Sequence, residues 1–291
     1  MKFVYLEPDS IKSTIKLLEN YGERGKILAG GTDLLVHLKR RTIRPDFVIH
    51  IGLIKDLEGI TIGNGGVQIG SLMTMRMIEK SEQLRGAYDV LRQGAAQVSS
   101  QQIRNVATLG GNLCNGISSA DSVPPLIALD AVAMVEGPKG QRIIPVEEFH
   151  IGSGKTMLGP DELLVGFKIP SQPPHTRGTY TKYTFRGTFE LAIVGIAVLL
   201  TLSPHDLTCK KARIAIGACG PVPIRARKAE LSLIGNKIDE HFIDEATRIA
   251  AEEINPNPGI SLRASASYRR EMVRVLGRYV LKDAFIRASK S

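Results

Sequence analysis

The stretch that decides the fold reads Asn105-Val-Ala-Thr-Leu-Gly-Gly-Asn-Leu-Cys-Asn115, and Ser118-Ser-Ala-Asp121 follows it closely. The paired glycines predict a tight turn, and the residues around them carry small hydroxyl and amide groups that donate and accept hydrogen bonds. Asp121 is able to accept a hydrogen bond from a sugar hydroxyl or a ring N–H. The stretch therefore indicates one wall of a site for a polar ligand.

A second glycine pair lies upstream, in Lys26-Ile-Leu-Ala-Gly-Gly-Thr-Asp33. An apolar strand runs into the glycines, a Thr/Asp cap follows, and a helix is expected from Leu34 to about Arg40. Glycines let successive backbone N–H groups point into one concavity, and a helix N-terminus adds positive potential, so the segment suits a phosphate or pyrophosphate. Neither pair fits the Rossmann or P-loop pattern, and a single Gly-Gly pair is more often a plain turn. Two such loops in one half of the chain predict a long ligand with two polar ends.

The remaining pattern predicts an α+β fold. Ser10 caps an expected helix that ends at Gly22, and a hairpin is expected over residues 60–69, around Gly63-Asn-Gly-Gly66. Strands and helices mix without regular alternation, which argues against a doubly wound parallel sheet. A segment rich in proline, Pro170-Ser-Gln-Pro-Pro174, predicts a boundary between domains 1–175 and 176–291.

Beyond this boundary the chain predicts three long strands and then two helices. The strands are expected at residues 179–185, 192–202 and 212–218, and the helices at residues 241–254 and 267–288. The six histidines show no spacing typical of a metal site, and we expect His150 to be structural.

Composition limits the classes of function. The chain has 291 residues, of which 43% are hydrophobic and 23% charged, as in a globular protein of about two domains. Its longest apolar run, from Leu191 to Leu202, is shorter than the roughly 20 residues that span a bilayer, and the N-terminus lacks the features of a signal peptide. We therefore expect a cytoplasmic protein that binds no membrane.

The cysteines and the charge point to partners. Cys114, Cys209 and Cys219 are too few and too scattered for a four-cysteine iron–sulfur cluster or a closed zinc site, so metal chemistry must come from another chain. A net charge of +9 suits an anionic ligand or an acidic partner subunit. Nucleic acid is not expected as a ligand, because aromatic residues make up only 5% of the chain and no reader motif is present.

Two strings carry a family resemblance: LAGGTDLL at residues 28–35 and QIRNVATLGGNLCNGISSADSVPPL at residues 102–126. They resemble the two FAD-binding signatures of the molybdenum hydroxylase flavoproteins. That family includes the flavin subunits of bacterial xanthine dehydrogenase, carbon monoxide dehydrogenase, nicotinate dehydrogenase and 4-hydroxybenzoyl-CoA reductase. The resemblance extends over nearly the whole chain, and residues 101–156 most resemble the xanthine dehydrogenase branch.

The resemblance implies a fold of the vanillyl-alcohol-oxidase (PCMH) type, in which two α+β lobes hold an extended FAD, followed by a smaller α+β domain of the carbon monoxide dehydrogenase flavoprotein C-terminal type. It implies no catalytic side chain and no metal ligand. The residues that it assigns to the pyrophosphate are Lys26, Ile27, Leu28, Ala29, Gly30, Gly31, Thr32, Asp33 and Leu34. Those assigned to the phosphate, ribityl and ribose region are Thr108, Gly110, Gly111, Asn112, Asn115 and Asp121, while Leu164 packs near the flavin or adenine and Lys182 lies close to the isoalloxazine.

Two of these positions carry open alternatives. A lysine near the isoalloxazine stabilises an anionic reduced flavin, but Lys182 is equally well read as a solvated strand lysine. The larger animal relatives place a phenylalanine over the flavin where this chain has Val98. Any aromatic stacking is therefore expected from Tyr180, Tyr183 or elsewhere.

The function that the resemblance implies is electron transfer. Substrate, with a purine such as xanthine favoured, is hydroxylated at a molybdenum cofactor on a large partner chain, and electrons pass through iron–sulfur centres on a small partner chain to FAD and then to NAD+. The alternatives are an FAD subunit with another substrate of the same family, a self-contained FAD oxidoreductase, and a non-enzymatic protein that binds a mononucleotide. A colourless purified protein would favour the last.

Overall fold

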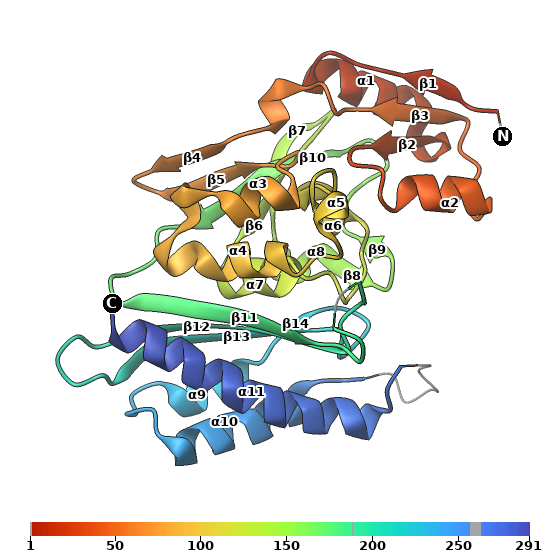
Figure 1. Cartoon of the computed structure of the whole chain (residues 1–291). Helices are drawn as coiled ribbons and strands as arrows, with labels where there is room; N and C mark the ends of the chain where they lie inside the picture. The colour runs from red at the N-terminus through yellow and green to blue at the C-terminus, as the bar shows by residue number, and fades with distance from the viewer. Residues whose placement is uncertain (1, 188, 257–262) are drawn as a thin grey trace.

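The computed structural model describes residues 2–187, 189–256 and 263–291. Three larger sheets follow one another through the described part of the chain, each with its own helices, and a two-stranded ribbon lies beside them (Figure 1). Helices and strands are mixed in every layer, which confirms the predicted α+β class.

The first lobe is a small parallel sheet with two crossover helices. Its strands β1 (Val4–Leu6), β2 (Gly25–Leu28) and β3 (Phe47–His50) lie in the order β1-β3-β2. Helix α1 (Ile11–Tyr21) joins β1 to β2, and helix α2 (Leu34–Arg40) joins β2 to β3. Parallel neighbours need such crossovers, since a short turn cannot return the chain to the same end of the sheet.

Helix α1 begins and ends where the sequence predicts. The Ser10 hydroxyl accepts a hydrogen bond from the backbone N–H of Ser13 at 3.3 Å, and Gly22 ends the helix with a φ of 51°. Ile15 and Leu18 are buried against the sheet. The sequence signal is complete here because the cap, the apolar face and the terminating glycine all lie within one segment.

The second lobe is a five-stranded antiparallel sheet in the order β4-β5-β10-β6-β7. Its strands are β4 (Ile60–Gly63), β5 (Gly66–Gly70), β6 (Val132–Gly137), β7 (Gly140–Pro145) and β10 (Leu163–Pro170). Its helices are α3 (Met75–Lys80), α4 (Asp89–Ala96), α5 (Gln101–Arg104), α6 (Leu109–Cys114), α7 (Val123–Ala128) and α8 (Val146–Phe149), and a two-stranded ribbon of β8 (His150–Gly152) and β9 (Lys155–Thr156) extends it. The predicted hairpin is confirmed as β4 and β5, which pair antiparallel.

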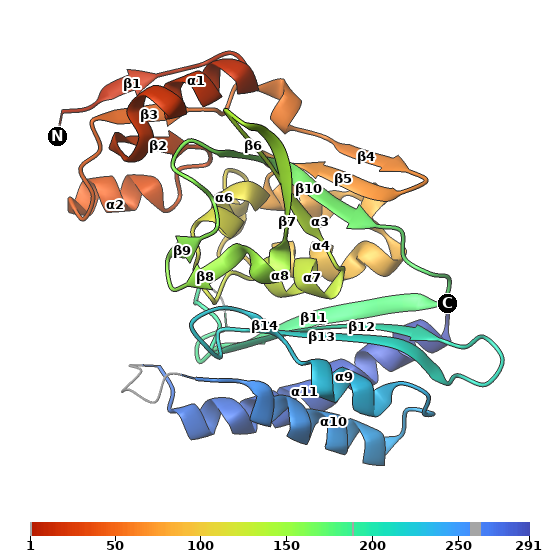
Figure 2. The ribbon, with the colours of Figure 1, turned by 180° about the vertical axis from the view of Figure 1, so that it is seen from behind.

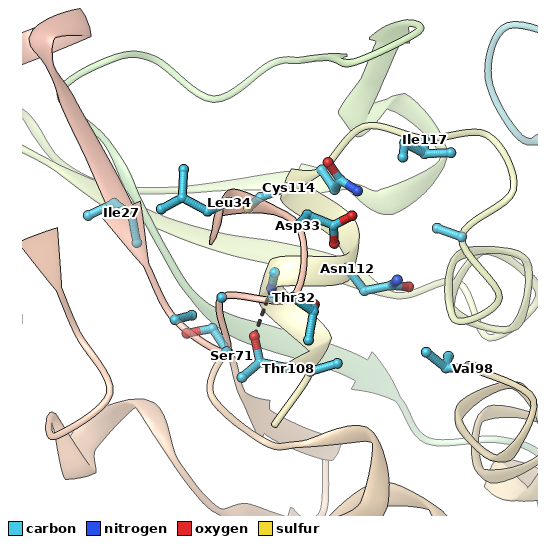
Figure 3. Close-up of a pocket in the computed structure, with 18 of the residues that line it drawn as sticks. Ile27, Thr32, Asp33, Leu34, Ser71, Val98, Thr108, Asn112, Cys114 and Ile117 are labelled. Atoms are coloured by element: carbon cyan, nitrogen blue, oxygen red, sulfur yellow. Dashed lines mark hydrogen bonds between the residues drawn. The ribbon is translucent and has the colours of Figure 1, made fainter. Parts of the chain in front are cut away.

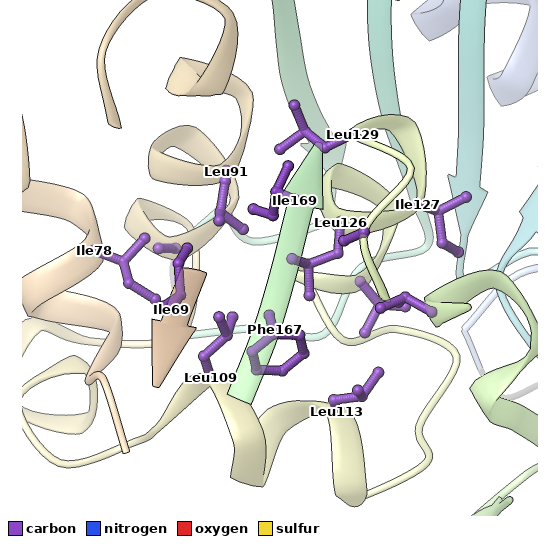
Figure 4. Close-up of a cluster of buried hydrophobic side chains, with 14 of the residues drawn as sticks. Ile69, Ile78, Leu91, Leu109, Leu113, Leu126, Ile127, Leu129, Phe167 and Ile169 are labelled. Atoms are coloured by element: carbon purple, nitrogen blue, oxygen red, sulfur yellow. The ribbon is translucent and has the colours of Figure 1, made fainter. Parts of the chain in front are cut away.

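The core of the second lobe gathers around strand β10. Phe167 is fully buried and lies among Leu109, Leu113 and Leu126, which come from helices α6 and α7 (Figure 4). Full burial of an aliphatic or aromatic side chain of this size contributes about 1.5–3 kcal/mol. This core fixes α6, the helix that carries the second glycine pair.

The chain enters the third sheet between Pro170 and Thr176. Its strands are β11 (Thr176–Tyr183), β12 (Val194–Leu202), β13 (Cys209–Gly217) and β14 (Ile224–Arg225), antiparallel and in chain order. Helices α9 (Arg227–Leu233), α10 (Glu240–Glu253) and α11 (Ala266–Ser289) cover one face, while α4 and α7 of the second lobe contact the other (Figure 2). Strand β12 is buried throughout because both of its faces are covered.

The three long strands and two helices predicted for this part of the chain are all present, with ends displaced by a few residues. Strand β11 starts at Thr176 rather than at residue 179 and stops at Tyr183 rather than at residue 185. Within the described ranges, no helix has both the length and the apolar character that a bilayer crossing requires.

Candidate cofactor-binding site

A cavity of about 670 Å³ lies where the first lobe, the second lobe and the loop between β11 and β12 meet. Cavities of this size hold small molecules and cofactors. Figure 3 shows Ile27 at one side of the view and Val98 at the other, with Thr32, Asp33 and Asn112 between them. Both glycine stretches therefore contribute to the walls of the cavity.

The two glycine stretches are in direct backbone contact. A Cβ atom placed on Gly30 would lie 1.9 Å from the carbonyl oxygen of Val106 and 3.1 Å from the Cα of Ala107. No side chain fits in that space, so Gly30 is required for the close approach of the two segments. The sequence predicted two loops that serve one ligand, and the structure brings them together at this residue.

The first glycine stretch forms part of the cavity wall, and its backbone N–H groups are candidates for a ligand. Among the described residues, the N–H groups of Gly30, Gly31, Thr32 and Asp33 have no hydrogen-bond acceptor. All four residues line the cavity, and Gly31 has a φ of +71°, which a residue with a side chain rarely adopts. Consecutive free N–H groups at the start of a helix form a concavity suited to a phosphate oxygen. The predicted side-chain cap is wrong, since Asp33 at the N-cap of α2 makes no capping hydrogen bond.

The second glycine pair is not the turn that the sequence predicts. Gly110 and Gly111 lie within helix α6, which Thr108 caps by accepting a hydrogen bond from the N–H of Gly111 at 3.0 Å. The N–H of Gly110 donates to the carbonyl of Ser71, and a Cβ on Gly110 would lie 2.8 Å from that carbonyl oxygen. Gly110 thus serves the packing of α6 on the segment after β5. Since these N–H groups are occupied, this wall offers side chains to a ligand.

Asn112 and Asp121 are the polar side chains of that wall. Asn112 accepts a hydrogen bond from the Ser122 hydroxyl at 2.6 Å through Oδ1, which leaves its amide N–H groups available to the cavity. Asp121 is buried, and its Oδ1 accepts from the Tyr180 hydroxyl at 2.8 Å while its Oδ2 accepts from Lys182 Nζ at 2.7 Å. Burial raises the pKa of the Asp121 carboxyl, and the Lys182 ammonium and the two hydrogen bonds oppose that shift.

The structure places the predicted site residues as follows. The cavity is lined by Lys26, Ile27, Ala29, Gly30, Gly31, Thr32, Asp33, Leu34, Thr108, Gly110, Gly111, Asn112, Asn115, Asp121 and Leu164. Leu28 and Lys182 do not line it. Leu28 points beneath the first glycine stretch, where its Cδ1 would lie 3.2 Å from a Cβ on Gly31. Lys182 contacts Asp121 but does not line the cavity. Its side chain is only 8% exposed, so the alternative of a solvated strand lysine is wrong.

The aromatic side chain of the cavity comes from a place that the sequence did not indicate. Val98 lines the cavity, as the resemblance implies, but Tyr180 and Tyr183 do not. Tyr180 is buried and its hydroxyl donates to Asp121. The hydroxyl of Tyr183 lies 3.0 Å from the hydroxyl of Tyr268, within hydrogen-bond distance. Phe189, in the loop between β11 and β12, lines the cavity and is 70% exposed. No local pattern singles out this phenylalanine, since only the packing of the third sheet brings its loop to the cavity.

Ser71 and Cys114 are two of the lining residues that the sequence did not indicate as part of the site. Ser71 is buried, and among the described residues its hydroxyl has no hydrogen-bond partner, which leaves the hydroxyl available to a polar ligand. Cys114 also lines the cavity, and burial raises the pKa of its thiol to about 12. The thiol therefore stays protonated at neutral pH and is a poor nucleophile.

His150 anchors the far end of helix α6. Its Nε2 donates to the carbonyl of Leu113 at 2.7 Å, its side chain is buried, and its Nδ1 has no partner within the described part of the chain. Burial lowers the pKa of His150, and the hydrogen bond to Leu113 only partly offsets this. The imidazole is thus neutral in the folded protein, which fits the structural role expected from the sequence.

This lowered pKa predicts a loss of stability in acid. The unfolded chain takes up a proton on His150 near its ordinary pKa of about 6.5, whereas the folded chain takes it up only at lower pH. Above pH 6.5 the neutral His150 makes its full contribution to the free energy of unfolding. Below pH 6.5 that contribution falls by at most about 1.4 kcal/mol per pH unit. Urea unfolding at pH 7.5 and 5.5 should show a larger acid loss for the wild-type chain than for His150→Gln. Equal losses in both proteins would contradict this.

Metal ligands are not gathered at the cavity: among the residues that the structure describes, no group of three or more His, Cys, Asp and Glu side chains is placed to hold an ion.

Comparison with known proteins identifies both parts of the chain. Residues 1–172 match the family described as the FAD binding domain in molybdopterin dehydrogenase, and residues 179–284 match the CO dehydrogenase flavoprotein C-terminal domain.

Individual relatives extend over the full length. The chain is 31% identical over 282 residues to the xanthine dehydrogenase FAD-binding subunit of Escherichia coli O157:H7, which covers 96% of this chain and 95% of that protein. It is also 31% identical over 286 residues to the carbon monoxide dehydrogenase medium chain of Afipia carboxidovorans, covering 98% of each. A structure of reconstituted CO dehydrogenase from Oligotropha carboxidovorans superposes with a TM-score of 0.94 at 30% identity, covering 99% of both chains.

Proposed function

Because this chain belongs to the family of FAD-binding domains of molybdopterin dehydrogenases, we propose that it is the electron-transfer subunit of a heteromeric molybdenum hydroxylase that oxidises a purine and reduces NAD+. Its cofactor is FAD, and it is an oxidoreductase subunit of the molybdenum hydroxylase family. The observation that carries the proposal is the run of free backbone N–H groups from Gly30 to Asp33, which faces the polar wall of Asn112 and Asp121.

The residues of the cavity fit FAD. We propose that the N–H groups of Gly30 to Asp33 hold its pyrophosphate, with Lys26 adding positive charge at the same side. Asn112 and Asp121 bind the hydroxyl groups of its sugar chain, and the flavin lies toward Val98 and Phe189. Leu164 and the other predicted residues of the lining complete the site.

The bound FAD supplies the redox chemistry, since a flavin exchanges single electrons with one partner and an electron pair with another. The protein supplies position and electrostatics. Both oxygens of the Asp121 carboxyl are occupied by Tyr180 and Lys182, and burial keeps the Cys114 thiol protonated, so neither group is arranged as a general acid or base.

We further propose two partner chains: a small subunit with iron–sulfur centres and a large subunit with the molybdenum cofactor. The low number of cysteines supports this division, because a four-cysteine cluster needs more ligands than this chain has. A purine substrate is favoured by residues 101–156, which resemble the xanthine dehydrogenase branch. We place the two modules of the chain at residues 1–175 and 176–291, and we place the complex in the cytoplasm.

Removal of this subunit from the complex tests the proposal. The complex of the other chains should lose purine-dependent NADH formation almost completely, while purine-dependent reduction of an artificial dye should persist, because dyes accept electrons from the upstream centres. The measurement is NADH absorbance and dye bleaching, with and without this chain, using xanthine or hypoxanthine as substrate.

Re-addition of the FAD-loaded chain is the control, and it should restore NADH formation. If nicotinate or carbon monoxide, and not a purine, supported dye reduction, the complex would belong to another branch of the family. Purine oxidation by this chain alone would overturn the subunit assignment and favour a self-contained oxidoreductase.

A further inference from the structure

The ammonium group of Lys182 joins three segments of the chain. Its Nζ donates to the carbonyl of Gln97 at 2.7 Å, to Oδ2 of Asp121 at 2.7 Å and to the carbonyl of Glu190 at 3.2 Å. All three N–H donors of a lysine are thereby used, and the side chain is 8% exposed. A lysine held in this way is a fixed part of the structure.

Each of the three acceptors borders the same side of the cavity. The Gln97 carbonyl lies directly before Val98, at the end of α4, and Val98 lines the cavity. Asp121 and Glu190 line it themselves, from the segment before α7 and from the loop between β11 and β12. One buried cation therefore connects the parts of the second lobe and of the third sheet that enclose this side of the site.

The strand that carries Lys182 is itself fastened to the second lobe. β11 is an edge strand, and its outward backbone groups bond to two glutamine side chains of α4 and its end. Gln93 Oε1 accepts from the N–H of Tyr180 at 2.7 Å, Gln97 Oε1 accepts from the N–H of Lys182 at 3.2 Å, and Gln97 Nε2 donates to the carbonyl of Tyr180 at 3.2 Å. Side chains take the place of a neighbouring strand, so the edge is covered and Lys182 cannot shift along it.

The segment that carries Asp121 is equally constrained. A Cβ on Gly94 of α4 would lie 2.7 Å from the Asp121 carbonyl, and a Cβ on Gly195 of β12 would lie 2.6 Å from the Tyr180 hydroxyl. Glycines at both contacts let Asp121 and its partners pack tightly at the junction. Because a buried carboxylate is costly without a counter-charge, Asp121 depends on Lys182 to stay ionised.

We infer that Lys182 is a positioning residue of the cofactor site, whose ammonium joins the three wall segments at the flavin side of the cavity. Its ammonium is the counter-charge of Asp121, which we propose accepts from a cofactor hydroxyl, and it fixes the Glu190 loop that presents Phe189. The inference rests on the proposal that FAD occupies this cavity.

The test compares Asp121→Asn with the double variant Lys182→Met/Asp121→Asn in the full-length chain. Removing Lys182 alone would leave a buried carboxylate and risk unfolding, whereas in Asp121→Asn the Lys182 ammonium keeps the carbonyl oxygens of Gln97 and Glu190 as acceptors. We expect the double variant to bind FAD at least about fivefold more weakly than Asp121→Asn and to release it faster, which is roughly 1 kcal/mol. Affinity for ADP, which carries only the pyrophosphate half, should be equal in the two variants.

Lys211→Met is the matched control. Lys211 also comes from the third sheet and pairs with a carboxylate of the second lobe, Asp130, at 3.4 Å, but neither residue lines the cavity. The FAD affinity of the Lys211→Met variant should stay within twofold of that of the wild type. Equal FAD affinity of the two Asp121 variants, or an equal loss for ADP, would overturn the inference. A wild-type chain that fails to bind FAD would instead overturn the proposed function.

Discussion

Gly30→Ala is expected to lose FAD binding almost entirely and to lower the stability of the chain. The new Cβ would lie 1.9 Å from the Val106 carbonyl oxygen, a distance that no real contact reaches, so the two glycine stretches must separate. Overpacking of this kind costs about 1–3 kcal/mol or more. The N–H groups of Gly30 to Asp33 move with the loop, and losing two charge-assisted hydrogen bonds at about 1.5–3 kcal/mol each weakens binding more than a hundredfold.

The measurement is the flavin content of the purified chain together with its dissociation constant and melting temperature. Gly111→Ala is the matched control from the other glycine pair, because its Cβ meets one side-chain atom, the Thr108 hydroxyl at 2.9 Å, and no backbone. Displacing this hydroxyl weakens the cap of α6, which alanine's higher helix propensity partly offsets, so stability should fall by no more than about 2 kcal/mol. Gly65→Ala, with open space around it, should behave as wild type. Wild-type FAD affinity in Gly30→Ala would show that the loop contact is dispensable.

The contrast between Gly30 and Gly111 shows what the sequence could predict of this site. Both glycine pairs were expected to be ligand loops, and residues of both line the cavity. Yet the conformational need differs: Gly30 lies against the backbone of Val106, whereas Gly110 and Gly111 lie in a helix whose first N–H groups are already bonded. A glycine pair looks the same in sequence whether its neighbour is a ligand or another segment of backbone.

Elements with complete local signals were predicted correctly. The helix after Ser10 and the hairpin of β4 and β5 each contain their own cap or turn and their own apolar pattern. The features that sequence could not give depend on partners far along the chain. Lys182 meets Asp121 across 61 positions, and Phe189 reaches the cavity only because the third sheet docks on α4 and α7.

A second junction between the second lobe and the third sheet is electrostatic. Asp130 follows α7 with a φ of 54°, and its carboxylate accepts hydrogen bonds from three cations of the third sheet. Arg213 Nη2 lies 2.8 Å from Oδ2, Arg225 Nη1 lies 3.0 Å from Oδ1, and Lys211 Nζ lies 3.4 Å from Oδ2. The arginine side chains are 12% and 11% exposed, so each relies on this carboxylate for part of its charge balance.

Asp130→Asn is therefore expected to lower the free energy of unfolding by about 2–3 kcal/mol. This loss is somewhat smaller than the loss expected from breaking a fully buried ion pair, because the carboxylate is 30% exposed. Asparagine keeps the shape and tolerates the left-handed backbone, so the change isolates the charge. Urea unfolding followed by circular dichroism measures the loss. Arg225 keeps its second partner Glu230, at 2.7 Å, and so Arg213 should account for most of the effect.

A double-mutant cycle separates the Asp130 network from general damage. If the carboxylate acts through Arg213, Asp130→Asn should cost much less in an Arg213→Met background than in the wild type, with a coupling of about 1–2 kcal/mol. Glu252→Gln, which breaks the exposed pair with Arg248, should change stability by less than about 0.5 kcal/mol and serves as the control. Because Asp130 joins the second lobe to the third sheet, weakening this junction should also produce a separate early unfolding step of that sheet. A single unshifted transition in Asp130→Asn would show that Gln93, Gln97 and Lys182 hold the two parts together without it.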